Sequence, residues 1–172
     1  MNTTKRFDRE LYNQADAAAK NAIVAWLETN NFVNIETKET MSFDLVCNKL
    51  KHNSSKEEHA KILEDSNNET NEPKKYFFEV EIKYAWKGEW PDDWKEIRIP
   101  YRKQKLIDRW LKEFPGDALT FVIFRNDCEM AWYITGDDVS NSEVKEVSNR
   151  NVSQGEKFFH INVENAELVN MK

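Results

Sequence analysis

The chain has 172 residues, which suits a single domain (1–172) with one hydrophobic core. Hydrophobic residues make up 40% of it and aromatic residues 12%, which argues against a disordered chain. The formal net charge is -6, and no apolar run approaches the roughly 20 residues that cross a bilayer. Residues 1–10 are polar and charged and lack the apolar stretch of a signal peptide. We therefore expect a protein of the cytoplasm, or of the intracellular compartment of a viral host, without a membrane partner.

The cysteines and histidines indicate neither a disulfide framework nor a zinc site. Cys47 and Cys128 lie in apolar, strand-like segments, so we interpret them as buried reduced thiols. The histidines are His52, His59 and His160, and their spacing does not match a zinc pattern. We expect all three histidines to be solvated.

The first part of the chain predicts one helix and two strands. Apolar residues recur at spacings of three and four over residues 8–29, which is typical of a helix that packs on one side. Alternation then predicts strands over 32–36 and 41–47. In the second strand Asp44 is expected on the opposite face from an apolar set, which comprises Met41, Phe43, Leu45 and Cys47.

Residues 48–75 are rich in Lys, Glu, Asn and Ser, so we interpret them as an exposed insertion with a short helix near 56–64. The clearest strand of the sequence follows over 76–84. One of its faces comprises Tyr76, Phe78, Val80, Ile82 and Tyr84. The other face comprises Phe77, Glu79, Glu81 and Lys83.

A tryptophan-rich connection, 86–94, leads to a helix over 101–114. We interpret the tryptophans as a hydrophobic cover over one sheet edge, with stacking on unpaired bases as the alternative. The helix is expected to turn four apolar side chains inward: Leu106, Ile107, Trp110 and Leu111.

Two strands over 118–124 and 130–134 follow, joined by a polar turn. Residues 135–156 are polar and predicted to be a loop, and 158–163 is predicted to be a last edge strand. The order is thus helix, three strands, helix and two strands. It predicts an α/β layered fold with a central mixed sheet flanked by helices.

Charged residues at strand positions predict a site for a divalent cation. Glu81 and Lys83 point the same way, about 6.6 Å apart along the strand. If the Asp44 strand pairs with this one, the two carboxylates can hold magnesium or manganese, which prefer oxygen ligands. Such an ion polarises a phosphodiester and makes hydroxide from bound water. Lys83 would orient that water or stabilise charge on the phosphate.

Asp44 followed by Glu81-Ile82-Lys83 resembles the signature of the PD-(D/E)XK nuclease superfamily. Residues 8–125 resemble its restriction-endonuclease-like αβββαβ core. The resemblance implies that Asp44 and Glu81 bind Mg²⁺ or Mn²⁺, that the carbonyl of Ile82 assists, and that Lys83 activates water. The family's proline before the aspartate is Phe43 here.

Many relatives add an acidic residue from the first helix to the metal site. Asp16 is the preferred candidate here, because Glu10 lies on the first turn, where an acid also suits the helix dipole. Glu79 is either a further carboxylate near the site or a solvated neighbour.

A basic segment follows the predicted catalytic strand. Within 97–112 six basic residues face one acidic residue, although the whole chain is acidic. Phosphate contacts dominate affinity for nucleic acids, so this segment favours DNA as the partner. The proposed contacts are Arg102, Lys103 and Gln104, at the start of the helix. A solvated basic face is the alternative interpretation.

The sequence therefore predicts a magnesium- or manganese-dependent endonuclease that hydrolyses DNA. The resemblance also admits a homodimer, because many relatives dimerise to cut two strands. A catalytically inactive module of the same fold, which binds DNA or a protein, is the main alternative. An assembly protein with an acidic binding surface is a third. A charged face that only forms cross-strand ion pairs would suit either alternative.

Overall fold

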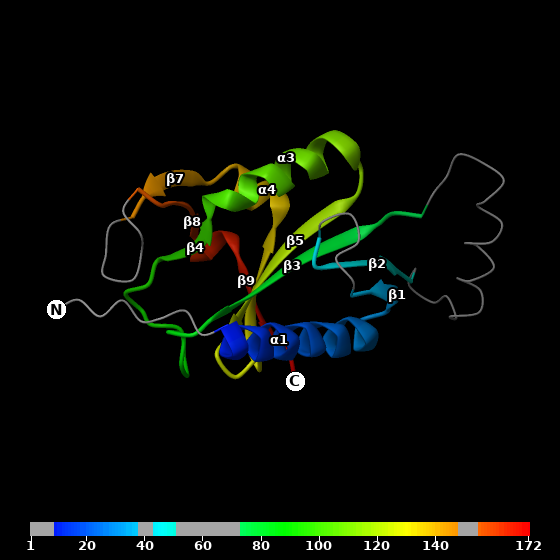
Figure 1. The fold of residues 1–172 in the computed structure, drawn as a ribbon, viewed down its shortest axis with the longest axis horizontal. Helices are drawn as coiled ribbons and strands as arrows, with labels where there is room; N and C mark the ends of the chain where they lie inside the picture. Colours follow the sequence, from blue (N-terminus) through cyan, green and yellow to red (C-terminus); the bar gives the residue numbers. More distant parts are fainter. Residues whose placement is uncertain (1–8, 38–42, 51–72, 148–154) are drawn as a thin grey trace.

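The computed structural model describes the chain over residues 9–37, 43–50, 73–147 and 155–172. A mixed β-sheet crosses the molecule between two helices (Figure 1). Helix α1 (Arg9–Thr29) covers one face of the sheet, and α3 (Gln104–Glu113) lies over the other. The predicted α/β class with a mixed sheet is confirmed.

The main sheet has six strands in the order β1-β2-β3-β5-β6-β9. They are β1 (Phe32–Glu36), β2 (Leu45–Lys49), β3 (Tyr76–Lys83), β5 (Ala118–Arg125), β6 (Met130–Thr135) and β9 (Glu167–Asn170). Strands β3 and β5 are parallel over eight residue pairs, and the other neighbours are antiparallel. The parallel pair requires a crossover, which α3 supplies. The predictions for β1, β3, β5 and β6 are confirmed, and β9 was not predicted.

A second sheet of three strands lies beside α3 (Figure 1). Its order is β4 (Glu96–Pro100), β8 (Lys157–Asn162) and β7 (Glu143–Glu146). The prediction of β8 as an edge strand is wrong, because β4 and β7 pair on both sides of it. The predicted loop over 135–156 is also wrong, since it contains the short helix α4 (Gly136–Ser140) and β7. All four residues of β7 are exposed, so the strand had no apolar signature.

The helices bury the apolar stripes that their spacing predicts, with one exception. In α1 the fully buried side chains lie four residues apart, at Ala19, Ile23 and Leu27. A short 3₁₀ turn, η3 (Tyr101–Lys103), precedes α3, which buries Ile107 and Trp110. The inward prediction for Leu111 is wrong, because its side chain is 50% exposed. Leu111 lies about 100° around the helix from Trp110, beyond the narrow stripe that contacts the sheet.

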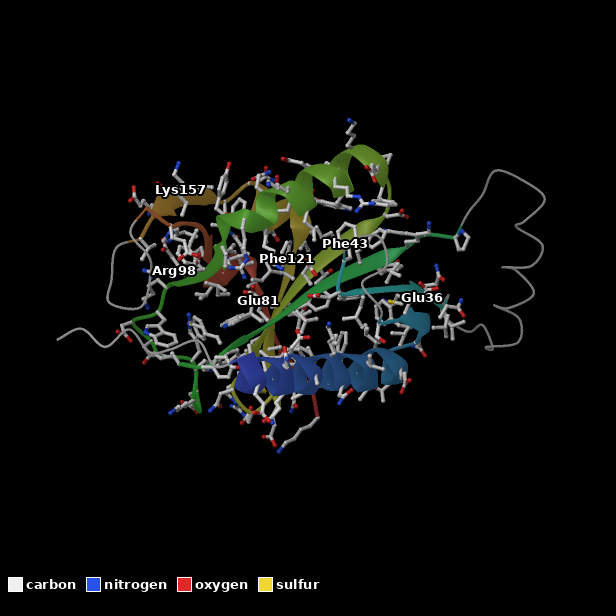
Figure 2. The ribbon with its side chains drawn as sticks, viewed as in Figure 1. Glu36, Phe43, Glu81, Arg98, Phe121 and Lys157 are labelled. Carbon is white, nitrogen blue, oxygen red and sulfur yellow. The ribbon has the colours of Figure 1, made fainter. Side chains whose placement is uncertain are left out.

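Alternating side chains of β3 divide the interior into two cores. Phe78 and Val80 lie in the core beneath α1, and Phe77 lies in the core on the α3 side. The prediction that Phe43 shares a face with Leu45 and Cys47 is wrong, since Phe43 packs on the α3 side (Figure 2). Strand β2 begins only at Leu45, and a bend at residues 43 and 44 breaks the alternation.

Several smaller predictions have mixed outcomes. Cys47 is buried and Cys128 half-buried, and both are free thiols. His160 was expected in solvent but is buried, with Nδ1 2.7 Å from Oε2 of Glu96. His52, His59 and most of the predicted insertion, including its helix near 56–64, lie outside the described residues. Within the described ranges, none of the helices is long and apolar enough to span a membrane.

Candidate active site

The site begins where β2 meets β3. Their antiparallel register pairs Leu45 with Phe78, which sets Asp44 beside Glu79. The backbone N–H of Asp44 donates to Oε2 of Glu79 at 3.0 Å, and the N–H of Val80 donates to Oδ2 of Asp44 at 2.9 Å. The Asp44 side chain thus takes the place of a strand partner for β3. The main-chain bonds hold the two carboxyl groups close together.

Glu79 is the most deeply buried acid of the described chain, at 3% exposure. Its Oε1 accepts from Nζ of Lys103 at 3.2 Å, across the gap between β3 and the turn η3. Burial, with the hydrogen bond and charge of the Asp44 side chain, raises the pKa of Glu79 to about 8, although the charge of Lys103 and the N–H of Asp44 lower it. At neutral pH Glu79 therefore keeps its proton.

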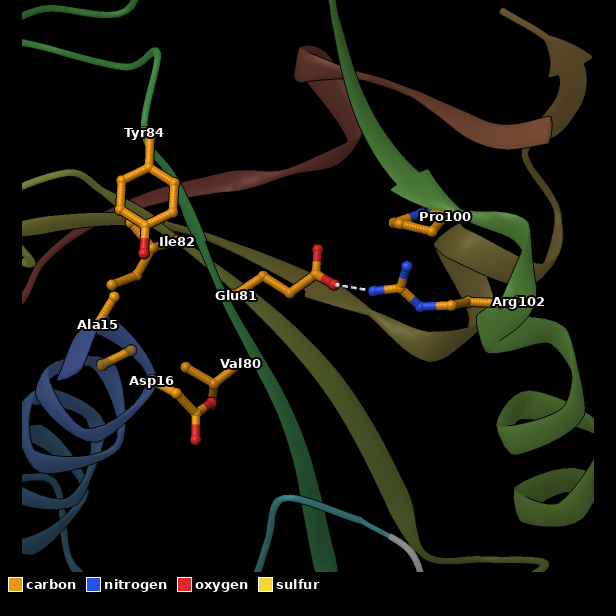
Figure 3. A pocket seen from close by; sticks show the side chains of 9 residues that line it. Ala15, Asp16, Val80, Glu81, Ile82, Tyr84, Pro100 and Arg102 are labelled. Atoms are coloured by element: carbon orange, nitrogen blue, oxygen red, sulfur yellow. Dashed lines mark ion pairs between the residues drawn. The ribbon is translucent and has the colours of Figure 1, made fainter. Parts of the chain in front are cut away.

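Glu81 points the same way as Glu79, one step further along β3. Figure 3 shows its side chain reaching toward Arg102, whose Nη2 lies 3.6 Å from Oε1. Burial raises the pKa of Glu81, while the charges of Lys103 and Arg102 lower it and that of Asp44 raises it. Glu81 thus interacts with the charge of Asp44, but the carboxyl that hydrogen-bonds to Asp44 is that of Glu79. We refer to Asp44, Glu79 and Glu81 as the acid cluster.

A cavity of about 230 Å³ opens beside Glu81, between α1, β3 and the end of β4. Asp16 lines this cavity from α1, together with Val80 and Arg102 (Figure 3). Asp16 bonds Lys20 one helical turn away, Nζ to Oδ2 at 3.1 Å. An acid of the first helix and Glu81 thus line the same cavity, although the Glu81 side chain points toward Arg102 and away from Asp16 (Figure 3).

Lys83 lies apart from the carboxylates. Its Nζ is 5.2 Å from the ring centroid of Trp94, which it covers. Burial and the neighbouring charge of Arg98 lower the pKa of Lys83, and Glu81 raises it. Lys103, by contrast, feels the charges of Glu79, Glu81 and Asp44, which raise its pKa against the effect of burial. The lysine that touches an acid of the cluster is therefore Lys103.

The predicted basic segment forms an open groove of about 410 Å³ with Glu79 in its lining. Four cationic residues line it: Arg102, Lys103, Lys105 and Arg109. Gln104 turns away to Asp108 on the same helix, Nε2 to Oδ1 at 2.7 Å. Two of the three predicted DNA contacts thus face the groove beside the acids.

In the described part of the chain, no three His, Cys, Asp or Glu side chains form a group that could hold a metal ion. Two carboxyls, Asp44 and Glu79, are in contact, and Glu81 lies within their electrostatic reach. Magnesium is commonly bound through one or two carboxylates, with water and substrate phosphate completing its shell. The donor set fits such an open site. Without a metal ion, the proton on Glu79 and the ammonium of Lys103 offset the negative charge of these carboxyls.

Sequence reasoning left Glu79 open, as a further carboxylate near the site or a solvated neighbour, and the structure buries it beside Asp44. It gave Lys103 a DNA contact and no carboxylate partner. The signal for Glu79 was its position on the same face of β3 as Glu81, two residues away. Its partner Asp44 depends on the β2–β3 register, and Lys103 depends on the crossover that places η3 over β3. Neither relation can be read from the local sequence.

Searches against protein-family models, curated proteins and solved structures give no match. The functional assignment therefore depends on the geometry of the site and on the resemblance of its motif.

Proposed function

We propose that the protein is a magnesium- or manganese-dependent nuclease that hydrolyses DNA phosphodiester bonds, of the PD-(D/E)XK type. The proposal is supported chiefly by one observation. The buried carboxyl of Glu79 and the half-buried carboxyl of Asp44 lie together, beside Glu81 and the cations of a basic groove. Burying an acid is costly, so Glu79, with two half-buried carboxyls near it, indicates a function that needs these acids.

In this proposal Asp44 and Glu81 hold the metal, as the motif implies, with Glu79 and the carbonyl of Ile82 as further donors. Asp16 completes the set from the far side of the cavity. When bound, the ion would lower the pKa of a water molecule and stabilise charge on the phosphate. Metal binding would have to displace the proton of Glu79, so affinity should rise with pH toward about 8.

The cations of the chain have separate tasks. Arg102 and Lys103 hold the DNA backbone at the groove, where phosphates replace their present carboxylate partners. Lys83 projects from the same face of β3 as Glu81 and stabilises charge on the phosphate or orients the attacking water. Gln104 remains a weaker contact candidate, because its amide is bonded to Asp108.

The test is incubation of the purified protein with plasmid and single-stranded DNA, with Mg²⁺, with Mn²⁺ and with a chelator. We expect metal-dependent cleavage that falls by about 10²-fold or more in Glu81→Gln and in Lys83→Ala. Glu28→Gln is the matched control, because this exposed acid of α1 carries the same charge and lines neither the cavity nor the groove. Cleavage that survives Glu81→Gln, or a parent that cuts none of these substrates, would contradict the proposal.

The second candidate is a module of this fold that binds DNA or a protein without cutting. It is favoured by the ion pairs that already neutralise the acids, Glu79 with Lys103 and Glu81 with Arg102. For this candidate, DNA binding would be unaffected by metal and would strengthen in Glu81→Gln, which removes a negative charge from the groove. A homodimer stays a prediction, which sedimentation of the parent protein tests.

A further inference from the structure

A second positively charged hollow lies one step along β3 from Glu81. Its volume is about 370 Å³, and it is lined by β3, by β4 and by the connection between them. Three cationic residues line it, namely Lys83, Lys95 and Arg98, together with the half-buried ring of Trp94. Since Lys83 follows Glu81 on the same face of β3, the hollow begins about 6.6 Å from the acid.

The cationic residues that line this hollow outnumber its acidic residues. In the ranges that the structure describes, no carboxylate oxygen lies within 4 Å of the charged nitrogens of Lys83 or Arg98. Of the two acids in the lining, Glu96 is engaged by His160 at 2.7 Å and by Lys145 at 4.0 Å, and Asp93 is exposed. Lys83 and Arg98 line the same hollow, so their like charges repel each other. A bound anion would relieve this repulsion.

The position of the hollow selects one kind of anion. If a DNA strand crosses Glu81 from the basic groove, its next backbone phosphate reaches Lys83 and Arg98. The Lys83 side chain is half-buried in the lining of the hollow, with its ammonium over the ring of Trp94. A flexible single strand can lower one phosphate into such a recess, whereas a duplex would have to carry its base pairs with it.

Resting on the proposed function, we propose that the hollow of Lys83, Lys95 and Arg98 binds a backbone phosphate of an unpaired DNA strand. The substrate class is then single-stranded DNA, or duplex DNA with an unpaired end at the site. Trp94 forms an apolar wall beside this phosphate, and its edge is held by Trp90 through a T-shaped contact at 5.1 Å.

The test measures binding of a labelled single-stranded oligonucleotide and of its duplex, in chelator, over a series of salt concentrations. Arg98→Gln removes a charge from an exposed position of β4, and Lys95→Gln provides a second variant in the hollow. Lys87→Gln is the control, because Lys87 is exposed on the same connection but does not line the hollow. For Arg98→Gln we expect about tenfold weaker binding of the single strand, since one charged hydrogen-bonding contact is lost.

The salt dependence gives the sharper readout. The slope of log affinity against log salt for the single strand should fall by about 0.7 in Arg98→Gln and in Lys95→Gln, and remain near the parental value in Lys87→Gln. Equal slopes in the hollow variants and the control would overturn the inference, and so would a loss that is the same for duplex and single strand.

Because binding is measured without metal, the outcome is separable from the proposed function. A parent that binds single strands through Arg98 but never cleaves would support this inference and refute the nuclease. A parent that cleaves, with Arg98→Gln binding and cutting as the parent does, would refute this inference alone.

Discussion

The two faces of β3 carry different kinds of side chain along the same eight residues. The face toward α1 is apolar throughout, and Phe78 and Val80 are buried there in one continuous core. The face toward α3 begins with the buried Phe77 and then carries Glu79, Glu81 and Lys83. The apolar face can be explained by stability alone. The polar face cannot, because Glu79 is buried there at a cost that an apolar residue would avoid.

This comparison indicates that one face of β3 stabilises the fold and the other carries the candidate functional groups. Pairing with β5 along its whole length holds β3 rigid in the sheet. The packed face anchors the strand, and the opposite face presents charged groups at fixed spacing. Substitutions that change one face at a time test this difference.

The largest effect on stability is expected on the apolar face. Phe78 is fully buried and makes an edge contact with Phe32, ring centroids 5.8 Å apart. Phe78→Ala should lower the free energy of unfolding by about 3–5 kcal/mol, measured by urea denaturation, because a cavity replaces a close-packed ring. Glu81→Gln, on the other face, should cost less than about 1 kcal/mol. A small loss in Phe78→Ala would show that this face is not the anchor.

Substitution of an acid on the polar face should instead change how the free energy of unfolding depends on pH. Burial and Asp44 raise the pKa of Glu79 from 4.5 to about 8. The folded protein therefore keeps a proton that the unfolded chain has lost, and stability from this group falls as pH rises from about 5 through 8. Thermal melts of Glu79→Gln, which mimics the protonated acid, should show a shallower fall over this window. Parallel curves for parent and variant would contradict the raised pKa.

The α3 side should also be tightly packed where it is apolar. A Cβ atom added to Gly136 would lie 2.8 Å from Cζ3 of Trp110 and 3.1 Å from Cβ of Leu119. Gly136→Ala should therefore cost about 1–3 kcal/mol in urea denaturation, because the neighbours must move. Ser140→Ala, in the same short helix, is the control and should change stability by less than about 0.5 kcal/mol. A neutral Gly136→Ala would mean that Trp110 has room to shift.

The smallest effect is expected at the rim of the polar face. Arg102 is 67% exposed, and its ion pair with Glu81 is 3.6 Å long. Arg102→Gln should change the free energy of unfolding by less than about 1 kcal/mol, because exposed ion pairs contribute little. The charge of Arg102 lowers the pKa of Glu81. In Arg102→Gln the Glu81 carboxyl should therefore take up its proton at a higher pH than in the parent, which carboxyl NMR titration would detect. An unchanged titration would show that the pair does not form in solution.

The sequence by itself predicted the elements whose periodicity is strong. The helix at residues 8–29 and the strand at 76–84 were recognisable because side-chain periods of 3.6 and 2 follow from backbone geometry. The same period placed Glu79, Glu81 and Lys83 on one face of β3. It failed for Phe43, for Leu111 and for the exposed strand β7, where a bend, a narrow contact stripe or the absence of apolar residues removes the signal.

Only the tertiary structure decided which charges meet. The register of β2 on β3 places Asp44 in contact with Glu79, and the crossover through α3 places Lys103 in contact with the same Glu79 carboxyl. The packing of the 84–95 connection set Trp94 under Lys83, which separates this lysine from the acids. The pairings of Glu79 with Asp44 and with Lys103 join residues 35 and 24 positions apart in the chain, and local periodicity carries no information at such separations.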